Sequence, residues 1–214
     1  MSRKFFIGVL ILAGLFCVIK MSFAGYEKTK SVASDQAAAP EAAQDTDPKM
    51  EAWKKASSPG EHHKALEIFT GNWNYSMRWW QSPEAQPEES KGSNKGEWIL
   101  GGRFVEQEVK GVAMGQPFEG LSITGYDNVK EEYNTVWLDN MSTGIMTSSS
   151  QYDAASKTFL EKGSFSCPMT GEKSRSFRGV IKIVDNDNYT YEMYGNDEAG
   201  KEFKVMEITY ARAK

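Results

Sequence analysis

Cysteine and histidine are scarce in this chain, and their scarcity removes several kinds of site. The only cysteines are Cys17 and Cys167, and the only histidines are the adjacent His62 and His63. Adjacent residues of a helix point to different faces, and no third ligand lies near the two histidines, so we expect no metal site. Cys167 has no histidine near it in sequence, which favours a structural or loop cysteine over a nucleophile.

Sequence motifs of hydrolases and nucleotide-binding proteins are also absent. The chain has no Gly-x-Ser-x-Gly turn, no phosphate-binding glycine loop and no His-Glu-x-x-His helix. The remaining route to catalysis uses strand-end carboxylates, with Asp127, Asp139 and Arg103 around a polar substrate. Asp127 is more simply explained as a turn residue, because an aspartate side chain bonds to nearby backbone amides in turns. An enzyme is therefore the alternative hypothesis, and the sequence assigns no catalytic residue.

An excess of positive charge is missing as well. The formal net charge is −4, and the first 24 residues hold three of the 25 basic residues and no acidic one. Without them, 22 basic residues face 29 acidic residues, so the net charge becomes −7. Nucleic-acid-binding domains need a positive surface, so we expect no nucleic-acid partner. Hydrophobic residues make up 40% of the chain, which is enough for one folded core.

The first 24 residues, 1–24, have the features of a signal peptide. Arg3 and Lys4 precede an apolar run over 5–19, which is shorter than the roughly 20 residues of a membrane span. The small residues Ser22 and Ala24 suit a cleavage site after residue 24. We expect an exported protein, periplasmic or secreted in a bacterium, without stable membrane insertion after cleavage. An anchor that is not cleaved is the alternative.

Residues 25–48 are mostly small or charged and predict a disordered linker. The expected folded domain covers 49–214. Its first part predicts a short N-terminal helix that begins at Ser58 and Pro59, which are typical of a helix start, and ends at Gly71.

After the helix, the pattern becomes that of β-strands. Trp73, Tyr75, Met77 and Trp79 alternate with polar residues, as in a strand with one buried face. A polar loop is expected over 81–94. Further expected strands cover 97–100, 104–109, 118–126, 133–138, 144–152, 158–166, 176–184, 189–194 and 203–211. About nine or ten strands joined by tight turns predict an all-β, antiparallel barrel, with a two-sheet sandwich as the alternative.

Several short motifs in this domain occur in a characteristic order. They are His63-Lys64-Ala65-Leu66, Gly71-Asn72-Trp73, Ile99-Leu100-Gly101-Gly102-Arg103-Phe104, Phe118-Glu119-Gly120, Gly125-Tyr126-Asp127 and Trp137-Leu138-Asp139. Over residues 60–212 the chain thereby resembles the family labelled domain of unknown function 1579. The resemblance implies a calycin-like barrel, related to the lipocalins and fatty-acid-binding proteins, and no established activity.

The resemblance also implies one structural contact and excludes one cofactor. In the calycin superfamily the early tryptophan packs under a basic residue of the last strand, and Trp73 and Arg212 are the matching residues here. One related group of barrels binds haem through a histidine late in the chain. No histidine follows His63, so we expect neither haem nor another cofactor.

The leading functional hypothesis is a binding protein that holds a small, partly apolar molecule inside the barrel. Barrel mouths are common ligand sites. The candidate ligand-binding residues, chosen by residue type and strand position, are Trp98, Arg103, Tyr126, Trp137 and Tyr191. Two alternatives stay open: the aromatic residues fill a solid core, and Arg103 is exposed or paired within the protein. A surface interaction module is a third hypothesis, suggested by the long linker.

Overall fold

A computed structural model of the protein describes residues 47–214. The predicted signal peptide (1–24), Cys17 and nearly all of the predicted linker (25–48) lie outside the described residues. Within the described part, no helix is long and apolar enough to cross a membrane.

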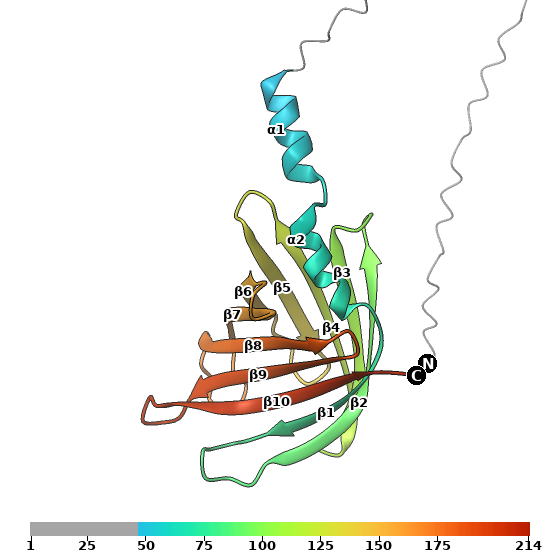
Figure 1. The fold of residues 1–214 in the computed structure, drawn as a ribbon. Coiled ribbons are helices and arrows are strands. Elements are labelled where there is room, and N and C mark those ends of the chain that lie inside the picture. The colour runs from blue at the N-terminus through green and yellow to red at the C-terminus, as the bar shows by residue number, and fades with distance from the viewer. Residues whose placement is uncertain (1–46) are drawn as a thin grey trace, which may run out of the picture. The chain divides into compact units, whose positions relative to one another are not determined.

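Short helices precede the barrel (Figure 1). They are α1 (Pro48–Ser57), α2 (Glu61–Lys64) and the 3-10 helix η1 (Ala65–Phe69). The predicted helix start at Ser58 is wrong by a few residues, because Ser58 follows the end of α1 and Gly60 precedes α2. The cap of α2 comes instead from His63, whose Nδ1 accepts a hydrogen bond from the Gly60 amide at 3.0 Å.

Ten antiparallel strands follow and close into a barrel, in which each strand pairs with its neighbours in sequence and β1 pairs with β10. The strands are β1 (Gly71–Trp79), β2 (Glu88–Ile99), β3 (Phe104–Ala113), β4 (Gln116–Asp127), β5 (Glu132–Asp139), β6 (Met146–Asp153), β7 (Thr158–Phe165), β8 (Arg175–Asp185), β9 (Asn188–Asn196) and β10 (Glu202–Arg212). The all-β antiparallel barrel is confirmed, and the sandwich is excluded because the sheet has no free edge.

The predicted loop over 81–94 is wrong in its second half, because β2 already begins at Glu88. The inward positions of this part of β2 include Gly92 and Asn94, so the strand lacks the apolar alternation that marks β1. A Cβ atom at Gly92 would lie 2.6 Å from the ring of Tyr75. Gly92 therefore makes room for the Tyr75 ring of β1. The first half of β2 can be recognised as a strand only from its pairing with β1.

The core lies at the end of the barrel next to α2 and η1. Leu66 and Phe69 of these helical turns are buried there. They pack against inward-facing residues of five strands, namely Trp73, Val105, Tyr133, Phe159 and Tyr189. The helical turns thus close one end of the barrel, and Phe69 forms part of the floor of the space beyond it.

Candidate functional site

The barrel encloses a cavity of about 840 Å³ above this floor. A barrel of ten strands is wide enough to leave space that its side chains do not fill. Met114, Met141 and Ile145, in the β3–β4 and β5–β6 connections, line the cavity and are also exposed. The cavity therefore opens to solvent at the end opposite the helices, and the barrel is filled by side chains only at its helix end.

One wall of the cavity is mainly apolar. It is formed by inward positions of β1, β8, β9 and β10, where the strand alternation of two residues places large side chains. The residues of this apolar wall are Tyr75, Met77, Ile181, Met193, Met206, Ile208 and Tyr210. Such a surface suits the hydrocarbon or aromatic part of a ligand.

The facing wall, on β3 to β7, carries a polar arc. Its members occupy paired inward positions of neighbouring strands and are Gln107, Ser122, Thr124, Thr135, Ser150 and Glu161. The Thr124 and Thr135 hydroxyls lie 2.9 Å apart in a hydrogen bond. Because this polar arc faces the apolar wall, the cavity is amphipathic.

Glu161 is the carboxylate of this arc, and only 8% of its surface is exposed. Ser148 donates a hydrogen bond to it. Burial raises the pKa of Glu161, and hydrogen bonds with Ser148 and Tyr191 offset this only in part. No ion pair in residues 47–214 includes Glu161. A buried acid without a cationic partner favours its neutral form unless a ligand supplies the charge.

Asn94 on β2 is a second polar residue of the cavity and is 2% exposed. Its Nδ2 donates to the Tyr189 hydroxyl at 3.4 Å. Its Oδ1 is buried and has no hydrogen-bond partner among the described residues. Buried polar atoms are nearly always paired, so an unpaired acceptor in a cavity wall is suited to a donor on a ligand.

Two of the five predicted ligand-binding residues, Trp137 and Tyr191, line the cavity. The Trp137 indole donates to Asp139 Oδ2 at 2.8 Å near the mouth. Tyr191 lies deeper, beside Glu161.

The other three, Trp98, Arg103 and Tyr126, lie at the helix end and do not line this cavity. The Trp98 indole donates to Glu67 of η1 at 2.7 Å. Arg103 Nε donates to the Ser57 carbonyl at 3.0 Å, which confirms that this arginine is paired within the protein. These side chains contact the helical segments that cover this end of the barrel. The sequence does not show which end of the barrel the helical segments cover.

Tyr126 packs against the two histidines. Its ring stacks on His62, with the ring centroids 4.5 Å apart, and meets the edge of His63. Burial lowers the pKa of His63, with His62 and Arg103 acting in the same direction. No group of three His, Cys, Asp or Glu side chains in the described range could hold a metal ion.

Sequence reasoning missed Glu161 and Asn94. Glu161 lies two residues after Phe159 and so shares its face of β7, but Leu160, which is 56% exposed, hides the alternation. Asn94 fell in the predicted loop. The sequence did contain a signal for Glu161. In the spacing Phe159-x-Glu161-x-Gly163, alternate residues fall on the same face of the strand as the buried Phe159.

The two strand-end aspartates do not form a catalytic pair. Asp127 lies at the helix end of β4, whereas Asp139 pairs with Gly120, seven residues away along that strand, or about 23 Å at about 3.3 Å per residue. Asp127 Oδ1 accepts hydrogen bonds from the Lys130 and Val129 amides, which lower its pKa. Asp127 is therefore a turn residue.

Comparisons with known proteins identify a family and several similar structures. The model of a protein family of unknown function, DUF1579, matches residues 58–212. The crystal structure of Rv2717c from M. tuberculosis is 14% identical with a TM-score of 0.54, covering 73% of this chain and 100% of that one. A redesigned β-barrel (12% identity, TM-score 0.37, 70% and 96% covered) and a de novo designed fluorescence-activating β-barrel (15%, 0.38, 70% and 97%) are also similar. No curated protein matches the chain.

Proposed function

The chain belongs to the DUF1579 family of unknown function, and we propose that it is a binding protein that holds a small, partly apolar molecule in the barrel. The observation that carries this proposal is the amphipathic cavity of about 840 Å³. Its volume lies within the usual range of ligand pockets, roughly 300–1,000 Å³. The apolar wall faces a polar arc, so a ligand with one apolar and one polar side could satisfy both.

A cavity-filling variant tests the proposal. Thr135 lines the middle of the cavity, and a tryptophan there would occupy space that is empty in the protein. Thr209 of β10 is exposed and points outward, so Thr209→Trp adds the same side chain outside the barrel. Exposed strand positions accept aromatic residues well.

Binding of decan-1-ol is then measured by native mass spectrometry and calorimetry. We expect one bound molecule in the wild type, at least about tenfold weaker binding in Thr135→Trp, and unchanged binding in Thr209→Trp. The proposal would be contradicted if both variants bound decan-1-ol equally well. It would also be contradicted if the wild-type protein bound neither decan-1-ol nor shorter and longer primary alcohols.

We further propose that the protein is exported and cleaved after residue 24. The support comes from the charge and hydropathy pattern of residues 1–24 alone. N-terminal sequencing of the protein from a periplasmic or culture fraction should give Gly25 as the first residue. A protein that keeps residues 1–24 in the cell body would contradict this proposal and favour the anchor.

A further inference from the structure

Glu161 packs closely against two neighbouring strands on the cavity wall. The residue pairs across the sheet with Gly179 of β8, and a Cβ atom at Gly179 would lie 2.3 Å from Glu161 Oε2. The same Cβ atom would lie 2.9 Å from the ring of Tyr191. The glycine thus leaves room for a carboxyl group and a tyrosine side by side on the cavity wall. Any larger residue at position 179 would displace one of them.

The protein provides no buried cation for this carboxylate. Within the described residues, no lysine or arginine is buried. Lys204 is held by Glu192 and Glu207, and Arg178 by Glu202. These pairs are partly exposed, and neither includes Glu161. A buried acid without a cationic partner is destabilising when ionised, so it either stays protonated or pairs with a positive group of a ligand.

A second polar atom of the cavity wall favours the same kind of ligand. Asn94 Oδ1 is an acceptor without a partner, and Glu161 is also an acceptor when ionised. A carboxylate ligand would meet two acceptors there and no buried cation, because Lys91, a lysine in the cavity lining, is exposed. A positively charged ligand with N–H groups would instead form an ion pair with Glu161, and its N–H groups are the kind of donor that Asn94 Oδ1 lacks.

We propose that the ligand is an amphipathic amine, whose ammonium group pairs with Glu161 while its apolar part lies against Met77, Met193 and Ile208. This inference rests on the proposed binding function and names the chemistry of its ligand. The bond is an ion pair supported by hydrogen bonds, and such charge-assisted bonds are about twice as strong as neutral ones.

Three ligands with the same ten-carbon chain separate the polar contribution from the apolar one. They are decylamine, decan-1-ol and sodium decanoate, each titrated below its aggregation concentration into the wild-type protein by calorimetry. The variant Glu161→Gln removes the charge and keeps the shape of the side chain. Glu97→Gln is the matched control, because Glu97 is exposed and pairs with Lys95 on the outside of β2.

We expect decylamine to bind at least about tenfold more tightly than decan-1-ol and decanoate to bind most weakly. In Glu161→Gln the advantage of the amine over the alcohol should disappear, whereas Glu97→Gln should keep it. If the alcohol binds as tightly as the amine, or if Glu161→Gln keeps the preference, the amine inference is overturned while binding in the cavity stands. If none of the three binds, both the inference and the proposed binding function fail.

Discussion

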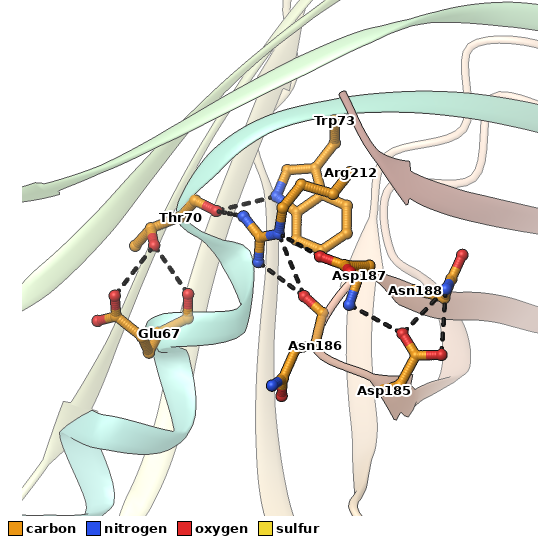
Figure 2. A network of polar contacts seen from close by, with 8 residues as sticks. All are labelled: Glu67, Thr70, Trp73, Asp185, Asn186, Asp187, Asn188 and Arg212. Carbon is orange, nitrogen blue, oxygen red and sulfur yellow. Dashed lines mark hydrogen bonds and ion pairs between the residues drawn. The ribbon is translucent and has the colours of Figure 1, made fainter. Parts of the chain in front are cut away.

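The Arg212 guanidinium lies over the indole ring of Trp73, with its Cζ 4.2 Å from the ring centroid (Figure 2). Both side chains donate to the Thr70 carbonyl, Trp73 Nε1 at 3.0 Å and Arg212 Nη1 at 3.1 Å. Arg212 also donates to the Asn186 carbonyl at 2.9 Å and pairs with Asp187 at 3.2 Å. One arginine of the last strand thereby joins the start of the first strand to the β8–β9 turn. The contact implied by the calycin resemblance is confirmed.

Removing this arginine should destabilise the fold. We expect Arg212→Ala to lower the free energy of unfolding by about 2 kcal/mol, because a cation–π contact and several charged hydrogen bonds are lost. Arg212→Lys should recover little, since an ammonium group cannot contact the Thr70 and Asn186 carbonyls in the same planar arrangement. Urea denaturation measures both effects. Arg78→Ala, which removes an outward arginine paired with Glu207, should cost much less. Wild-type stability in Arg212→Lys would contradict the argument.

A methyl group at Gly92 should disturb the packing of β1 against β2. The added Cβ atom would lie 2.1 Å from the Lys110 carbonyl oxygen and 2.6 Å from the Tyr75 ring. We expect Gly92→Ala to cost about 1–3 kcal/mol or more in thermal or urea unfolding, as overpacking does elsewhere. Ser93→Ala, at the next and outward position, should change stability by no more than about 0.5 kcal/mol. Equal effects of the two variants would show that the contact is relieved at no cost.

Glu161 should make stability depend on pH. Burial raises its pKa in the folded protein, so the folded state holds the proton at pH values where the unfolded chain has lost it. Stability from this residue is therefore full below the unfolded pKa and is lost as the pH rises through the raised folded pKa. Glu161→Gln cannot ionise, so we expect it to be more stable than the wild type at neutral pH, by a margin that shrinks toward acidic pH. Urea unfolding over a pH series measures the difference in unfolding free energy between the variant and the wild type. A difference that does not change with pH would contradict this prediction.

Cys167 should react slowly in the folded protein. It is 8% exposed, in the β7–β8 connection. Burial raises the pKa of the thiol, but hydrogen bonds with Thr170, Met169 and Arg175 outweigh this and leave the pKa lowered. In a Cys17→Ser variant, we expect modification by a disulfide reagent to be at least about tenfold slower in buffer than in urea, because access controls the rate. Equal rates would show that this connection opens freely.

Local patterns predicted much of the fold. The alternation in β1 predicted a strand over residues 73–79, and the structure has Gly71–Trp79. Asp127 was predicted to be a turn residue, and its Oδ1 accepts a hydrogen bond from the Val129 amide at 2.8 Å. These features depend on neighbours within a few residues, and for that reason they can be predicted from the sequence.

The candidate site could be predicted from the sequence only in part. Trp137 and Tyr191 were identified, but Trp98, Arg103 and Tyr126 lie under or beside the helical turns at the closed end. Residue type alone does not distinguish an aromatic side chain that fills the closed end from one that lines the cavity. Both face inward on their strands, and only the position along the barrel axis separates them.

The sequence by itself determined that the domain is all-β and that its strands are joined by tight turns. The family resemblance implied that Trp73 and Arg212 meet. The tertiary structure alone decided which end of the barrel is closed, where the cavity begins, and that Glu161 faces it without a cation. The physical reason is the distance along the chain. Strand periodicity is a local property, whereas the cavity results from ten strands closing a ring and from a helical turn that fills one end of it.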